Sequence, residues 1–286
     1  MGTTLSSIVT APAHGQGSHF AVRRLDLQGL GAMAFPVMGF DHYRMRGPTF
    51  APHPHAGFSA LSYVFEDSSG GLRNRDSLQH DVVISPGSLV WTQAGTGIVH
   101  EKFPAFNAHE VHGVQIFVNQ SKKAKQLPPD MFHLDRAMVP VVMDTQGNRT
   151  RVLSGRFSGA TSPIKPVEAF DLLDVQVVGD WNFEVPRRRN TLIYALSGRV
   201  AVSVGAHART LSAFEAVTVR VTRPSTLHIK AETAAQLLVL SGTDPGEPIA
   251  RHGPFIMNDA DALEAAFERY RDGAMGRITP LGDAMR

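Results

Sequence analysis

Three histidines in the first half of the chain have the types and the spacing of a metal site. The segment PHPHAGF carries His53 and His55 two residues apart, so in a strand both imidazoles project from the same face. His100 ends another apolar run, after the turn-forming AGTG. Two strands of one barrel can bring the three rings together, and imidazoles bind divalent iron, zinc, copper or nickel. The alternative is a set of inward polar side chains that are satisfied by hydrogen bonds.

A lysine follows two residues after His100, on the same strand face. A negatively charged ligand at this position would strengthen metal binding, whereas a lysine is positively charged. A unit charge about 6 Å from a divalent ion, at an effective dielectric of about 20, is repelled by roughly 5 to 6 kcal/mol, or about four decades of affinity. Either Lys102 turns its ammonium away to solvent or is neutralised by burial, or the site is weak or empty. Glu101 points to the opposite face unless a β-bulge turns it inward.

Other histidines of the same half lack a partner two residues away: His42, His80, His109 and His112. We expect each to be a hydrogen-bonded surface or core residue. If the three histidines have a fourth protein ligand, Glu101 is the first candidate and His42 the second.

The elements that must position these residues are β-strands. Between about residues 20 and 240, apolar residues come in short runs of near period two, separated by Gly, Pro, Asn and Asp. The order of strands and turns around 60–119 recurs around 191–243, which indicates duplication of a whole β domain. Only the end of the chain is helical in pattern, with Asn258 as the expected cap and an apolar stripe from Ala262 to Tyr270. This pattern predicts an all-β protein of two barrels or sandwiches with a short C-terminal helix.

The domain boundaries follow from this repeat. We expect an N-terminal barrel with the metal site over 1–140, a connection over 141–165, and a C-terminal barrel with the helix over 166–286. In the second copy, EVPRRRNTLIYAL replaces PHPHAGFSALSYV, so arginines and Asn190 stand where the first copy has histidines. The second barrel is therefore expected to bind no metal.

Several longer stretches resemble the pirins, two-domain members of the cupin superfamily. They are PHPHAGFSALSYVFE, RDSL, SPGSLVWTQAGTGIVHEKFP, HGVQIFVN and IARHGPFIMN, in the family's order along both halves of the chain. The resemblance implies two tandem cupin barrels of the jelly-roll type, a bicupin. It also implies an iron-type metal, Fe(II), on His53, His55 and His100. The family's fourth ligand is a glutamate that would fall at Lys102, so this chain departs from the pattern there.

The resemblance implies two kinds of function. One is a quercetin 2,3-dioxygenase-like oxidoreductase with a small aromatic, flavonol-like substrate, in which Lys102 or an inward Glu101 would serve as the catalytic base. The other is a metal- or redox-dependent regulatory protein with a protein partner. A third alternative is a pirin that has lost its metal.

Composition excludes several other classes. A formal net charge of +2 does not indicate nucleic-acid binding, and the absence of cysteine excludes disulfides and thiolate metal sites. No apolar stretch is long enough for a membrane span, and no signal-peptide pattern begins the chain. We therefore expect a cytoplasmic location and no membrane association.

Overall fold

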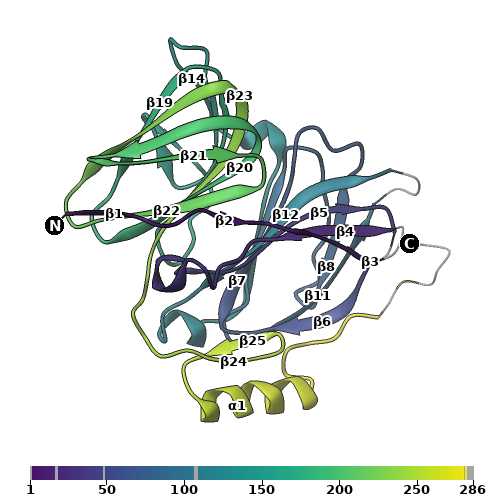
Figure 1. Cartoon of the computed structure of the whole chain (residues 1–286). Helices are drawn as coiled ribbons and strands as arrows, with labels where there is room; N and C mark the ends of the chain where they lie inside the picture. The colour runs from purple at the N-terminus through teal and green to yellow at the C-terminus, as the bar shows by residue number, and fades with distance from the viewer. Residues whose placement is uncertain (1, 17–18, 48, 106–108, 280, 282–286) are drawn as a thin grey trace. The chain divides into compact units, whose positions relative to one another are not determined.

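The computed structural model describes residues 2–16, 19–47, 49–105, 109–279 and 281. They form many short strands and one α-helix, which confirms the predicted all-β architecture with a short C-terminal helix (Figure 1). No helix among these residues is long and apolar enough to cross a membrane. The chain divides into two compact units, each of which combines separate stretches of sequence.

Unit 2 consists of 13–24, 39–137 and 245–286 and contains the candidate site. Its larger sheet has seven strands in the order β13 (Asp130–Leu134), β10 (Leu89–Gln93), β7 (Phe58–Val64), β12 (Val111–Asn119), β5 (Val37–Met45), β4 (Phe20–Arg24) and β3 (Ala13–Gln16). Its second sheet has four, in the order β6 (Phe50–His55), β11 (Ile98–Pro104), β8 (Leu72–Asp76) and β9 (Asp81–Ile84). A short 3₁₀ helix, η2 (Ala124–Gln126), precedes β13.

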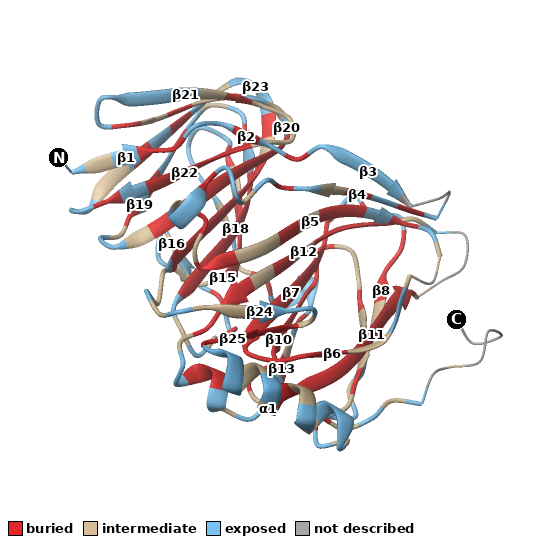
Figure 2. Ribbon diagram, turned by 60° about the horizontal axis from the view of Figure 1, so that its bottom comes forward, coloured by how far each residue is buried: buried red, intermediate tan, exposed pale blue. Residues whose placement is uncertain are grey.

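The core of unit 2 lies between these two sheets. Tyr43 and Val64 of the larger sheet pack in one apolar cluster with Leu72 and Ile84 of the smaller one. Figure 2 shows β7 and β11 as buried strands, and every residue of both is buried. Because both of its faces are covered, β7 is apolar or small almost throughout, whereas β11 carries the buried polar residues His100, Glu101 and Lys102.

The C-terminal segment closes one end of unit 2. A hairpin of β24 (Ala250–His252) and β25 (Phe255–Met257) leads into α1 (Ala260–Arg271), and Figure 1 shows them in yellow beside β6. Asp259, not Asn258 as expected, caps the helix by accepting a hydrogen bond from the Ala262 N–H at 2.8 Å. The Asn258 side chain donates instead to the Pro248 carbonyl.

Unit 1 consists of 1–12, 25–38 and 138–244. Its main sheet follows the order β1 (Thr3–Leu5), β22 (Glu215–Val221), β20 (Arg189–Val204), β23 (Ser225–Thr243), β18 (Phe170–Val177), β15 (Arg149–Ser154) and β14 (Val141–Met143). Three more strands pair with it: β2 (Val9–Thr10), β19 (Asp180–Val185) and β21 (His207–Ser212). The remaining short elements of unit 1 are β16 (Arg156–Phe157), β17 (Ala160–Thr161) and η1 (Gly31–Met33), and η3 (Arg136–Met138) lies at the change from unit 2 to unit 1.

This grouping differs from the boundaries expected in sequence order. The first twelve residues belong to unit 1, and the C-terminal helix belongs to unit 2 with the first barrel. The expected connection over 141–165 contains β14 and β15, which are strands of the unit 1 sheet. Its polar residues form the turn between them, where Asp144 accepts hydrogen bonds from the backbone of Gln146 and Asn148.

Candidate metal centre

Three histidines from two neighbouring strands converge in unit 2. His53 and His55 lie on β6, and His100 lies on β11 directly opposite His53 in the antiparallel register. One ring nitrogen of each histidine lies within 4.8 Å of the others. The ring centroids are 4.6 to 4.8 Å apart. The convergence expected from the H-x-H spacing is therefore confirmed, while the role of the three residues as metal ligands stays a prediction.

Hydrogen bonding fixes which nitrogen of His53 faces the cluster. Its Nδ1 lies 2.8 Å from the Ala51 carbonyl, which only accepts, so Nδ1 carries the proton. Nε2 then presents a lone pair, and it lies 3.1 Å from Nε2 of His100. A neutral imidazole held in this way is the form that binds a metal.

Burial keeps the other two rings neutral as well. It lowers the pKa of His55 and of His100 well below the ordinary value, and the nearby Lys102 charge lowers both further. The carbonyl of Pro254 acts in the opposite direction on the pKa of His55. Three neutral imidazoles with converging nitrogens fit a divalent ion, because none of them carries the second proton of an imidazolium, which would have to leave before the ion binds.

Lys102 lies in the same pocket and not in solvent. Only 4% of its surface is exposed, and its Nζ donates to Ser62 Oγ and, at 3.1 Å, to Gln115 Oε1. Burial lowers its pKa to about 7, which the charge of Asp76 partly opposes. Of the alternatives for Lys102, an ammonium turned away to solvent is therefore wrong, because two polar side chains of the larger sheet hold it inside, while the lowered pKa agrees with neutralisation by burial.

Glu101 is not brought to the histidines. It pairs in regular register with Arg75 of β8 and accepts a hydrogen bond from the Arg75 guanidinium. A bulge does occur beside it, but in the other strand. His100 is opposite His53 and Lys102 is opposite Phe50, so two residues of β6 face the single residue Glu101. The hypothesis that a bulge turns Glu101 inward therefore finds no support in the geometry.

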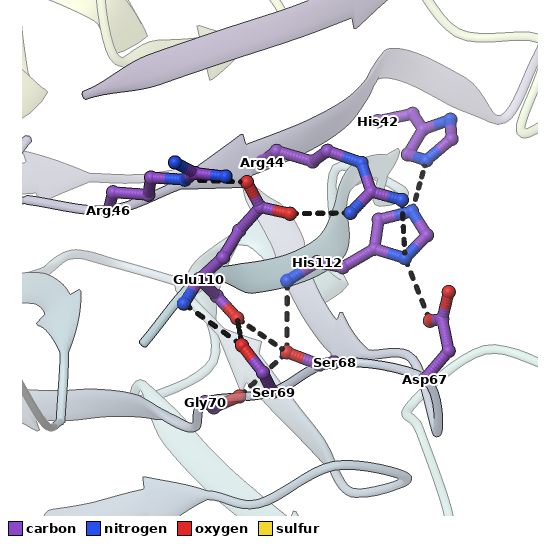
Figure 3. A network of polar contacts seen from close by, with 9 residues as sticks. All are labelled: His42, Arg44, Arg46, Asp67, Ser68, Ser69, Gly70, Glu110 and His112. Carbon is purple, nitrogen blue, oxygen red and sulfur yellow. Dashed lines mark hydrogen bonds and ion pairs between the residues drawn. The ribbon is translucent and has the colours of Figure 1, made fainter. Parts of the chain in front are cut away.

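His42, the second candidate for a fourth ligand, belongs to a separate network (Figure 3). Its Nε2 lies 2.7 Å from Nε2 of His112, whose Nδ1 donates to Asp67 at 2.7 Å. Arg44 and Glu110 extend the network toward the surface. Burial, followed by the charges of its neighbours, lowers the pKa of His42 to about 3. Both histidines thus have the hydrogen-bonded role expected for residues outside the metal cluster.

A cavity of ≈ 80 Å³ lies beside the histidines, between the two sheets of unit 2. Its apolar lining comes from both sheets: Phe20, Tyr43, Met45, Phe50, Leu72 and Phe117. Its polar lining consists of the three histidines with Asp41, Lys102 and Gln115. Asp41 forms an ion pair with Arg24 at 2.9 Å, which offsets its charge.

Several of these residues were not recognised in the sequence. Gln115 and Ser62, the partners of Lys102, carry no motif of their own. The alternation in HGVQIFVN does place Gln115 and Phe117 on one face of a strand, and this was the available signal. Which face of which strand meets Lys102 depends on how the two sheets pack.

The C-terminal hairpin supports β6 at the ligand positions. Ala56, next to His55, forms a parallel bridge with Phe255, and the Ile256 N–H donates to the Ala56 carbonyl at 3.0 Å. Gly57 makes this approach possible, since a Cβ there would lie 2.0 Å from the Ile256 carbonyl oxygen. The segment HGPFIMN thus contacts the end of the strand that carries two of the three histidines.

In unit 1 the corresponding positions have structural partners. Arg189 forms an ion pair with Asp171 at 2.5 Å, and the Asn190 amide donates to the Phe35 carbonyl at 2.6 Å. His228 lies 2.8 Å from the Asn182 side chain on an exposed stretch. Among the residues that the structure describes, the one group of three or more potential metal ligands is the cluster in unit 2.

Comparison with known proteins agrees with this architecture. The family model described as Pirin matches residues 28–118, and the Pirin C-terminal cupin domain matches 172–276. A pirin-like protein of Caulobacter vibrioides is 32% identical over 228 residues, which cover 78% of this chain and 79% of that protein. The chain belongs to the Pirin family.

Two further relatives carry names that mention an activity. A Pseudomonas aeruginosa protein provisionally named a quercetin 2,3-dioxygenase is 29% identical, over 84% of this chain and 86% of its own length. The crystal structure of a quercetin 2,3-dioxygenase from Acinetobacter baumannii superposes with a TM-score of 0.83 at 24% identity, covering 97% of this chain and 99% of that one. This likeness confirms the fold of two tandem cupin domains.

Proposed function

We propose that unit 2 holds one divalent metal ion on His53, His55 and His100, and that the chain is an oxidoreductase of the quercetin 2,3-dioxygenase kind. The observation that carries this proposal is the convergence of three ring nitrogens within 4.8 Å beside an apolar cavity. Three protein ligands leave coordination positions open, as catalytic metal sites require. The two relatives named as quercetin dioxygenases support the class of reaction.

The resemblance to pirins makes Fe(II) our first choice of metal, while three imidazoles also suit zinc, copper and nickel. When bound, the ion would supply Lewis acidity and open positions for an enediol or enolate substrate and for dioxygen. At position 102, where the resemblance to pirins places a carboxylate, this chain has a lysine. We infer that Lys102, at the position of the family's catalytic carboxylate, binds the acidic oxygen of the substrate. Glu101 remains paired with Arg75 and takes no part.

The apolar wall would orient a flat substrate. Phe117 lines the cavity with its ring centroid 5.7 Å from that of His55, and the buried Phe58 packs edge to face against Phe117 at 5.0 Å. Such rings exclude water and offer faces for a planar conjugated molecule. This places apolar contacts and the three histidines on neighbouring sides of one cavity.

The test is metal analysis of the full chain purified without chelators, followed by a flavonol bleaching assay in air after loading with Fe(II). We expect about one ion per chain and oxygen-dependent bleaching, with both lost in His100→Ala and kept in the matched control His228→Ala. Metal without bleaching of any flavonol would favour the regulatory alternative. Failure of every metal to bind at this site would contradict the proposal.

A further inference from the structure

The pocket contains a buried lysine amine that no carboxylate contacts. Within the described residues, no carboxylate oxygen lies within ion-pair distance of Lys102 Nζ. Asp76 is on the neighbouring strand, but its oxygens accept hydrogen bonds from the backbone of Leu78 and from both the backbone and the ring of His80. Asp41 lines the cavity and is paired with Arg24. The charged form of this amine is costly without a contacting counterion, so an anion from outside the chain would stabilise that form.

The hydrogen-bonding groups around Lys102 also select an anion. Gln115 Oε1 accepts hydrogen bonds from Ser62 Oγ at 2.6 Å and from Lys102 Nζ. These two bonds fix the orientation of the Gln115 amide, so its Nε2 points away from Ser62 and Lys102. Nε2 is buried and has no hydrogen-bond partner among the described residues. An ammonium has three donors, and two of those of Lys102 go to Ser62 and Gln115. The two groups left over are both donors, and they suit a ligand oxygen that only accepts.

The size and lining of the cavity restrict the rest of the ligand. A volume of ≈ 80 Å³ is about half of the roughly 150 Å³ cavity that holds a benzene molecule. A three-ring flavonol exceeds this volume, so only one end of it would enter and the rest would extend out past Phe50. Phe50 is 39% exposed at the mouth and packs edge to face with Phe20 at 5.6 Å, so a ring that extends outward meets aromatic side chains.

We propose that this pocket binds a small planar organic monoanion, a conjugated or aromatic carboxylate or enolate, with its charged oxygen on Lys102 and Gln115 and its apolar body toward Phe50. This proposal names the substrate class of the proposed function. It depends on that function only in one respect, namely that the same anion also contacts the metal. In the family pattern, a glutamate of the protein at this position supplies a negative charge beside the metal. In this chain, we infer that the bound ligand supplies that negative charge.

Lys102 then affects the binding of the metal and the binding of the anion in opposite ways. Lys102 repels a divalent ion and attracts the anion, so removing its charge moves the two affinities in opposite directions. An anion that contacts both groups also couples their binding, and linkage requires the same factor in each direction. These relations hold for equilibrium binding and do not depend on turnover.

The experiment measures benzoate and its neutral isostere benzamide by titration calorimetry on the metal-free full chain, and then Ni²⁺ on the same samples. We expect benzoate to bind at least about tenfold more tightly than benzamide, since one charge-assisted contact accounts for that factor. Lys102→Met should weaken benzoate about tenfold or more and tighten Ni²⁺ by about twofold or more at pH 7, since an amine with a pKa of about 7 can lose its proton when the ion binds. The matched control Lys123→Met, at an exposed lysine, should change neither affinity.

Equal binding of benzoate and benzamide, no binding of benzoate to the wild-type chain, or an unchanged benzoate affinity in Lys102→Met would each overturn the anion pocket. These outcomes are read without metal. Absence of Ni²⁺ binding to both chains would instead contradict the proposed metal centre and leave the anion result standing. The two proposals therefore fail on different measurements.

Discussion

At the scale of single residues, the difference between Glu101 and Lys102 decides the chemistry of the pocket. Strand alternation puts neighbouring side chains on opposite faces, and Lys102 lines the cavity while Glu101 meets Arg75. The cation is therefore the residue that a bound metal or substrate would encounter. Its two hydrogen-bond acceptors, Ser62 and Gln115, hold it in that place.

Restoring an acid at this position should create a stronger metal site. Lys102→Glu replaces repulsion by attraction, so we expect the affinity for Ni²⁺ or Fe²⁺ to rise by about four decades or more. The control Glu101→Gln removes the neighbouring carboxylate, which faces Arg75, and should leave metal affinity unchanged. Competition with a chelator of known affinity measures both. An unchanged affinity in Lys102→Glu would show that residue 102 does not face the ion.

At the scale of elements, the site depends on contact between β6 and the C-terminal hairpin. Phe255 and Met257 of the hairpin, Met275 after α1, and Ala56 beside the ligands form one buried apolar cluster. The Met275 carbonyl also accepts a hydrogen bond from Ser77 Oγ at 2.7 Å. The C-terminal segment is thus packed into unit 2 and shields the end of the strand that carries His53 and His55.

Gly57 is the residue on which this contact depends most. Its φ of +83° is strained for other residues, and an added Cβ would meet the Ile256 carbonyl at 2.0 Å. We expect Gly57→Ala to lower the free energy of unfolding of unit 2 by about 2 to 4 kcal/mol, from strain and overpacking together. Gly253 has a φ of +54° with open space around it, so Gly253→Ala should cost only about 1 kcal/mol. Urea unfolding compares the two, and equal losses would contradict a role for the close approach.

At the scale of the whole molecule, the two units differ in how protons affect them. Burial lowers the pKa of His42, His55, His100 and His112, and all four lie in unit 2. In unit 1 burial instead raises the pKa of Asp171, against the effect of Arg189. The two kinds of shift have opposite consequences for stability in acid.

We therefore expect unit 2 to lose stability first as the pH falls. Each buried histidine is neutral in the folded unit, and in the unfolded chain it takes up a proton below about pH 6.5. Its contribution is complete above that pH and is lost on the way down toward the folded pKa, about 3 for His42. The loss is up to about 1.4 kcal/mol per pH unit for each histidine. The raised pKa of Asp171 has the reverse sign, because the folded unit 1 then binds a proton more readily than the unfolded chain.

Each unit contains one of the two tryptophans, so fluorescence can follow them separately. Trp91 is buried in unit 2 and Trp181 in unit 1. In Trp181→Phe, the signal of Trp91 should show a free energy of unfolding that falls steeply from pH 7 to 5, and His42→Asn should reduce that slope. In Trp91→Phe, the signal of Trp181 should change little over the same range. Equal slopes for the two units would contradict the assignment of the acid sensitivity to unit 2.

Local patterns in the sequence determined the β architecture, the duplication, the family and the three histidines, because strand alternation and turn residues act over a few positions. They also indicated that Lys102 shares a face with His100 while Glu101 does not. Only the tertiary structure decided that the lysine is held inside by Ser62 and Gln115, and that Arg75 receives Glu101. It also decided that the C-terminal hairpin and helix belong with the first barrel. These contacts join strands of different sheets and distant parts of the chain, and their register is set by packing, which no local pattern encodes.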